Sequence, residues 1–214
     1  MMEIQKKLTR VNRTIANSRR IKYIVIHYVG GVSSAKNNVD YLYNVDRQKS
    51  AHYFVDEKEI WQCVDDSNTA WHVGGAKKYY NDCRNSNSIG VELCCKKDEA
   101  GNWYFEEQTV QNAIELVQYL MRLHGIKIEN VVRHYDVTHK ICPEPFVRDE
   151  EAWNSFKRRL VMKEITDVKE ALDYLVEQGR ITDRDYWEKA IQTTRNVEFA
   201  FIKWANDVQK LESK

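Results

Sequence analysis

Residues 23–26 form the run Tyr-Ile-Val-Ile, in which three of the four side chains are β-branched and none is charged. A continuous apolar run of this kind is typical of a strand that is covered on both faces. The chain must therefore place other elements on both sides of this strand. His27 follows directly, at the point where the apolar run ends.

Four further segments have strand-like patterns. Residues 51–55 and 60–64 are separated by a polar four-residue turn, which predicts a hairpin. Residues 88–94 are predicted to form another strand, and Gly90 within it allows a neighbouring group to approach closely. Residues 128–132 are predicted to return as a strand. Several strands are thus available to a sheet built around residues 23–26.

Helical patterns alternate with these strands. A short helix is expected to end near Asn44, and a longer amphipathic helix is expected to end at Gly125. The apolar face of the longer helix consists of Val110, Ala113, Ile114, Val117, Leu120 and Met121. Residues 65–87 are rich in Asn, Asp and Gly and predict a long functional loop. Because strands and helices mix without strict alternation, we predict an α/β fold with a mixed central sheet flanked by helices.

The last part of the chain has a different character. We predict a domain of residues 1–162 and a small helical domain of residues 163–214, without a Pro/Gly-rich linker between them. Asp167 and Gly179 are expected to begin and end its first helix, and Thr182 to begin the second. The third helix carries more large apolar groups than a solvent-facing helix needs: Phe199, Phe201, Ile202 and Trp204. Such a helix packs on its neighbours, on the larger domain or on a second copy of the chain.

Charge and cysteine content limit the class of protein. The formal net charge is +1, with −3 in residues 164–214 and therefore +4 in residues 1–163. This is too little for a dedicated nucleic-acid-binding protein, but a mildly basic larger domain suits an anionic polymer. Five cysteines are an odd number at irregular spacing, so we expect buried thiols and no disulfide framework.

The N-terminal residues include several basic side chains but no apolar run of signal-peptide length, and no later run is long enough to span a bilayer. We therefore expect a chain that is made in the cytoplasm without a signal peptide and does not insert into a membrane.

Three residues together suggest a metal site. His27 and His134 each follow an apolar strand-like run, and Cys142 stands on a loop next to a proline. Zinc hydrolases use three protein ligands of this kind and leave a fourth position for water. The simpler alternative is that the histidines bond to backbone groups and that the cysteine is an ordinary buried thiol.

Several short motifs follow one another along residues 20–160: His27 at a strand end, Ser50–Asp56, Ala70–His72, Ser88–Leu93, Arg133–His134 and Lys140–Pro143. In this order they resemble the zinc N-acetylmuramoyl-L-alanine amidases, which include phage endolysins and cytosolic muropeptide amidases and share a fold with the peptidoglycan recognition proteins. The resemblance implies one Zn²⁺ per chain and cleavage of the amide between muramic acid and L-alanine of peptidoglycan.

The resemblance also implies roles for individual residues. His27, His134 and Cys142 would bind the zinc ion, and Lys140 would stabilise the developing oxyanion. Some members of the family place a catalytic tyrosine at the position that Ala51 occupies here. The branch without this tyrosine uses a glutamate on the next strand, so Glu92 is expected to be the general base.

Each of these residues also has a structural interpretation. Glu92 could be a paired structural carboxylate, and Lys140 an ordinary solvated lysine. His52 and His72 could line a substrate groove or bond to backbone groups. Trp71 could stack on a sugar ring or belong to the core.

Three functions are consistent with the sequence. The chain could be a phage or prophage endolysin that cuts the bacterial wall after holin-dependent release, or a cytosolic amidase that recycles muropeptides. It could also be a non-catalytic peptidoglycan-binding module, although such relatives usually lack a zinc ligand. The helical domain of residues 163–214 would bind the wall or form a homodimer.

Overall fold

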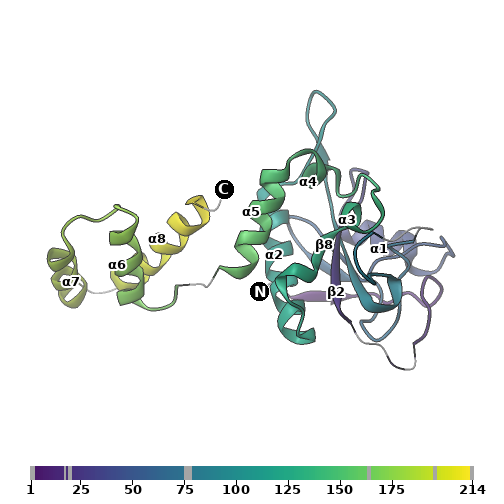
Figure 1. Cartoon of the computed structure of the whole chain (residues 1–214), viewed down its shortest axis with the longest axis horizontal. Coiled ribbons are helices and arrows are strands. Elements are labelled where there is room, and N and C mark those ends of the chain that lie inside the picture. The colour runs from purple at the N-terminus through teal and green to yellow at the C-terminus, as the bar shows by residue number, and fades with distance from the viewer. Residues whose placement is uncertain are drawn as a thin grey trace. The chain divides into compact units, whose positions relative to one another are not determined.

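The computed structural model describes residues 3–16, 18, 21–74, 79–162, 165–194 and 197–212 (Figure 1). The chain divides into two compact units, Met1–Leu160 and Val161–Lys214. Residue 163, at which the second predicted domain begins, lies outside the described residues.

A six-stranded sheet forms the centre of the first unit. Its strands lie in the order β1 (Ile4–Lys6), β4 (Ile60–Gln62), β3 (Tyr53–Val55), β5 (Ser88–Leu93), β2 (Tyr23–Tyr28) and β8 (Val131–Arg133). The β3–β4 pair is antiparallel, as the predicted hairpin requires, and the other neighbouring strands are parallel. The predicted mixed sheet is confirmed. Residues 128–130, however, form a 3₁₀ turn, so the last strand begins later than predicted.

Helices cover both faces of this sheet. They are α1 (Ala35–Tyr43), α2 (Glu107–His124), α3 (His134–Thr138), α4 (Glu144–Arg148) and α5 (Glu150–Val161). A second, two-stranded sheet pairs β6 (Lys96–Lys97) with β7 (Trp103–Tyr104), and a further 3₁₀ turn spans Asn85–Asn87. In Figure 1, α2 and α5 lie on one side of β2 and β8, and α1 lies on the other.

Alternation along β2 assigns its side chains to the two faces. Ile24 and Ile26 belong to the main core, into which α2 and α5 also pack. Tyr23 and Val25 belong to a smaller cluster on the opposite face. His27 follows the same alternation and therefore projects from the face away from α2. Both faces of β2 are buried, as its apolar run predicts.

The predicted apolar stripe of α2 faces the sheet. Its buried residues include Val110, Ala113, Ile114, Val117 and Leu120. Gly125 ends the helix in a left-handed conformation with φ of 64°, which glycine adopts without steric cost. The predicted helix and its end are both confirmed.

The second unit consists of α6 (Val168–Glu177), α7 (Arg184–Thr193) and α8 (Val197–Glu212). The Asp167 carboxylate accepts hydrogen bonds from two backbone N–H groups at the start of α6, as the sequence predicts. Asp183, and not Thr182, caps α7. The core of this unit contains Ile165, Ala171, Leu172, Leu175, Ile181, Phe201, Ala205 and Val208. Phe199 on α8 remains 74% exposed.

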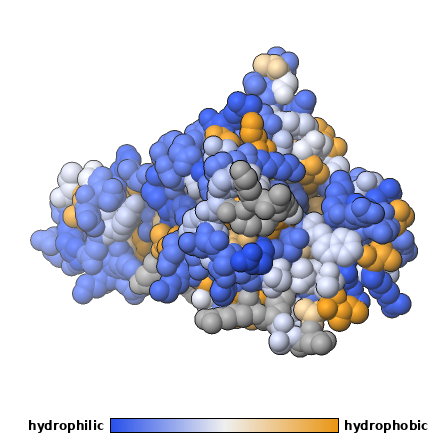
Figure 2. Space-filling model, turned by 45° about the vertical axis from the view of Figure 1, so that its right-hand side comes forward, coloured by the Kyte–Doolittle hydropathy of each residue, from blue (hydrophilic) through white to orange (hydrophobic). Residues whose placement is uncertain are grey.

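The face shown in Figure 2 is mainly hydrophilic, and its hydrophobic residues occur in small groups. Within the described ranges, no helix has both the length and the apolar character needed to cross a bilayer. All five cysteines are buried and free.

Candidate metal and catalytic site

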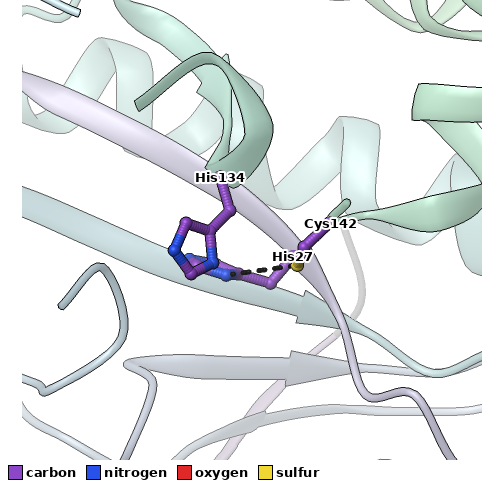
Figure 3. A group of neighbouring side chains, drawn as sticks. All are labelled: His27, His134 and Cys142. Carbon is purple, nitrogen blue, oxygen red and sulfur yellow. Dashed lines mark hydrogen bonds between the residues drawn. The ribbon is translucent and has the colours of Figure 1, made fainter. Parts of the chain in front are cut away.

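Three potential metal ligands converge on one point of the first unit. His27, His134 and Cys142 are all buried, and one donor atom from each lies within 4.8 Å of the others. The sulfur of Cys142 is 3.7 Å from Nδ1 of His27, and the two imidazole centroids are 4.7 Å apart. Figure 3 shows the three side chains approaching one another from separate segments.

Local structure explains this convergence. His134 is the first residue of α3 and follows β8, which pairs with β2. The loop after α3 is closed by a hydrogen bond of 2.8 Å from the Tyr135 N–H to the Cys142 carbonyl. This bond returns Cys142 to the neighbourhood of His134. The spacing of the two ligands in the sequence therefore reflects one short helix and one closed loop.

The Arg133 side chain holds this loop against the helices that follow. Its guanidinium contacts the Asp136 carboxylate at 2.9 Å and the Glu150 carboxylate at 2.7 Å. It also donates a hydrogen bond of 2.9 Å to the Phe146 carbonyl. Because Arg133 immediately precedes His134, these contacts fix the backbone from which the His134 side chain projects.

Burial shifts the pKa values of His27 and Cys142 in opposite directions. It lowers the pKa of His27 well below the ordinary value, and the neighbouring His134 and His72 lower it further. A neutral imidazole is the form that binds metals. Burial also raises the pKa of the Cys142 thiol to about 12. A bound cation would have to displace that proton, since the thiolate is the metal ligand.

Glu92 lies beside this group. It is the register partner of His27 across β2 and β5. Part of the residue reaches solvent, but Oε2 is shielded from it and has no hydrogen-bond partner among the described residues. Burial raises the pKa of Glu92 to about 8, although Lys140 and Lys49 lower it in part. A shielded carboxylate oxygen next to two nitrogen donors and one sulfur donor fits a site for a soft divalent cation.

A cavity of about 230 Å³ opens onto these residues. Its lining includes His27, Tyr28, Asn38, Tyr41, Lys49, Ser50, Trp71, His72, Glu92, His134, Lys140 and Cys142. Lys140 is exposed and reaches the cavity from the loop that carries Cys142. Lys49 gives the cavity a second ammonium group. The sequence offered no signal for Lys49, because an exposed lysine in a polar loop has no distinctive pattern.

His52 differs from the other two residues predicted to bind substrate, because it does not line the cavity. His52 is fully buried, and its Nδ1 accepts a hydrogen bond of 3.0 Å from the Gly90 N–H. Its Nε2 lies 3.2 Å from the Asn68 carbonyl. His52 is not part of the described cavity lining. Of its two predicted roles, the geometry favours bonding to the backbone.

Trp71 and His72 do line the cavity. Trp71 is half-buried, and its indole N–H donates to the Thr14 hydroxyl at 2.9 Å. His72 is buried, with Nδ1 3.0 Å from Nε2 of His27. Trp71 is therefore placed to contact a molecule bound in the cavity. His72 also contacts His27, a potential metal ligand, and the sequence around His72 did not indicate this contact.

Comparisons with known proteins agree with this geometry. The family model described as N-acetylmuramoyl-L-alanine amidase matches residues 17–145. The amidase CwlL of Bacillus licheniformis is 34% identical over 173 residues, which cover 75% of this chain and 47% of CwlL.

Solved structures give the same picture. PlyL is 29% identical with a TM-score of 0.63, and the match covers 74% of this chain and 97% of PlyL. A mutant endolysin from Bacillus subtilis is 30% identical with a TM-score of 0.62, and the match covers 75% of this chain and 99% of the endolysin. The chain spans about half the length of the curated relatives it matches.

Proposed function

The chain belongs to the N-acetylmuramoyl-L-alanine amidase family, and we propose that it hydrolyses the amide between N-acetylmuramic acid and L-alanine in peptidoglycan. One Zn²⁺ per chain would be held by His27, His134 and Cys142. The observation that carries this proposal is the approach of their three donor atoms to within 4.8 Å of one another, beside the shielded carboxyl group of Glu92.

A zinc ion held by His27, His134 and Cys142 would supply Lewis acidity toward the scissile carbonyl and toward water, and its charge would favour the ionised form of Glu92. Glu92 then takes a proton from the attacking water and passes it to the leaving amine of L-alanine. The Lys140 ammonium group stabilises the negative charge that develops on the carbonyl oxygen. Trp71 and His72, on the cavity wall, would contact the substrate.

We assign this activity to wall degradation, as in a phage or prophage endolysin. One of the solved structures with which the chain aligns is described as an endolysin. An enzyme of this kind acts on the wall after release from the cytoplasm, which in a phage is holin-dependent.

The second unit would hold the enzyme on the wall or join two copies. Phe199 and Trp204 on α8 are 74% and 39% exposed and offer an apolar contact for either role. Full-length Glu92→Gln protein, with and without Phe199→Asp, should be compared for retention on purified wall and for mass by light scattering. Loss of retention supports wall binding, and a change from dimer to monomer supports dimerisation. If neither measurement changes, Phe199 serves neither role.

The proposed activity is tested by incubating the full chain with intact peptidoglycan and with a soluble muramyl peptide, with and without a chelator. New L-alanine amino termini from intact peptidoglycan, lost on chelation, are the expected result. Cleavage of the soluble compound alone would indicate a recycling amidase. Retention on the wall without new amino termini would indicate a non-catalytic binding module.

A further inference from the structure

A chain of hydrogen bonds leads away from the first of the three ligands. Nε2 of His27 lies 3.0 Å from Nδ1 of His72, and Nε2 of His72 lies 3.2 Å from the Ser88 hydroxyl. The Ser88 hydroxyl donates a bond of 2.7 Å to the Arg84 carbonyl. The side chains of His27, His72 and Ser88 are all buried.

The last member of this chain determines the direction of every bond in it. A carbonyl can only accept, so the Ser88 hydrogen is committed to Arg84, and the Ser88 oxygen accepts from Nε2 of His72. A neutral imidazole has one donor and one acceptor nitrogen, so Nδ1 of His72 accepts from Nε2 of His27. The lone pair of His27 is then on Nδ1, the nitrogen that lies 3.7 Å from the Cys142 sulfur.

The backbone of β5 makes room for this arrangement. A Cβ atom at Gly90 would lie 2.6 Å from Cγ and 2.8 Å from Nδ1 of His72, which is too close for any side chain. Gly90 therefore leaves the space that the His72 ring occupies, and the close approach predicted at this glycine is confirmed. The sheet thus accommodates the His72 ring in the position from which it contacts His27 and Ser88.

We propose that His72 and Ser88 are positioning residues, which hold the His27 ring as the Nε2–H tautomer and so present its Nδ1 lone pair to a divalent cation. This inference rests on the proposed zinc site and adds the groups that prepare it before metal binds. Metal-binding histidines commonly donate their second ring N–H to a neighbouring acceptor, and loss of that acceptor typically weakens metal binding about 10–100-fold.

The tautomer can be read directly in the full-length, metal-free protein. Long-range ¹H–¹⁵N correlation spectra of histidine-labelled protein distinguish the protonated ring nitrogen from the unprotonated one. We expect Nε2–H and an unprotonated Nδ1 for His27. Ser88→Ala removes the hydroxyl that fixes the direction, so a substantial fraction of His27 should change to the Nδ1–H tautomer. Ser155→Ala, which removes a buried hydroxyl on α5, is the matched control and should leave the spectrum unchanged.

Zinc affinity, measured by competition with a chelating dye, provides the second readout. Ser88→Ala should weaken binding about tenfold and His72→Ala about 10–100-fold, with no change for Ser155→Ala. A protonated Nδ1 on His27 in the wild-type protein would overturn the proposal. The proposal would also be overturned if Ser88→Ala and Ser155→Ala proteins had the same His27 tautomer or the same zinc affinity. If the wild-type protein shows the expected tautomer but binds no zinc, the proposed function fails instead.

Discussion

His27 and Glu92 are register partners on the adjacent parallel strands β2 and β5. Paired residues on neighbouring strands project from the same face of a sheet, so a proposed metal ligand and the proposed base leave the sheet side by side. Their separation is set by the spacing of hydrogen-bonded strands and does not depend on a loop. A site built in this way has its base in position before substrate arrives.

Glu92→Gln is therefore expected to abolish turnover without loss of metal. The amide occupies the space of the carboxylate but cannot accept the proton of the attacking water, so the turnover number should fall about 10²–10⁴-fold. The release of L-alanine amino termini measures turnover, and atomic absorption measures bound zinc. Glu99→Gln, on the exposed turn between β6 and β7, is the matched control and should remain fully active. A fully active Glu92→Gln enzyme would rule out Glu92 as the base.

The pKa of Glu92 predicts how the stability of the metal-free protein depends on pH. Burial raises this pKa from 4.5 to about 8 in the folded state. Between these values the unfolded chain releases a proton that the folded chain retains, so the free energy of unfolding falls as pH rises, by at most about 1.4 kcal/mol per pH unit. Urea unfolding at pH 5 and pH 8 should show this loss in the wild-type protein and a smaller one in Glu92→Gln. An equal loss of unfolding free energy between pH 5 and pH 8 in the two proteins would contradict the raised pKa of Glu92.

Sequence reasoning predicted those parts of the fold that depend on hydrophobic periodicity or on the backbone conformation of a single residue. The alternation of β2, the apolar stripe of α2 and the left-handed glycine at Gly125 are local properties, and each was found as expected. The N-terminal strand Ile4–Lys6 was missed because its composition is polar and it pairs only at the sheet edge with β4. Its strand conformation depends on that partner and has no local pattern.

Helix α5 was missed although its sequence contains a signal. Trp153, Phe156 and Leu160 recur at helical spacing and enter the main core. The position of His72 had no such signal, because it depends on the space left by Gly90 on another segment. The candidate ligands could be identified from motif order. The hydrogen bonds that orient them could not be predicted from the sequence, because they join residues from separate segments of the chain.

Cys142→Ala is expected to remove the metal. The remaining two imidazoles are too few for a zinc site, so bound zinc should fall to trace amounts after dialysis. Cys63→Ala, which removes another fully buried thiol from a different cluster, should retain zinc. Metal analysis of both proteins after dialysis decides between these outcomes. Stoichiometric zinc in Cys142→Ala would show that the sulfur is not a ligand.

Lys140→Met should slow turnover and leave zinc binding intact. Methionine keeps much of the apolar length of the side chain but removes the charge that we propose stabilises the developing oxyanion, so a fall of about 10²-fold in turnover number is expected. Lys36→Met, at an exposed position on α1, provides the control. Steady-state kinetics on a soluble muramyl peptide would measure the effect. An unchanged turnover number with a raised KM would indicate that Lys140 only binds substrate.

The two units should unfold separately, because each has its own buried core. Leu175→Ala removes a fully buried side chain from the second unit, which should lower that unit's free energy of unfolding by about 2–5 kcal/mol. Leu211→Ala, at a position that is 63% exposed, should have little effect.

Zinc should raise the free energy of unfolding of the first unit only, because a ligand stabilises the unit whose folded form binds it. The gain is about 4 kcal/mol when the ligand is present at a thousandfold excess over its dissociation constant. Calorimetry of the full chain should therefore show one transition that Leu175→Ala lowers and a second that chelation lowers. A single transition that moves with both changes would mean that the units are thermodynamically coupled, and the helical unit would then have to be treated as part of the catalytic fold.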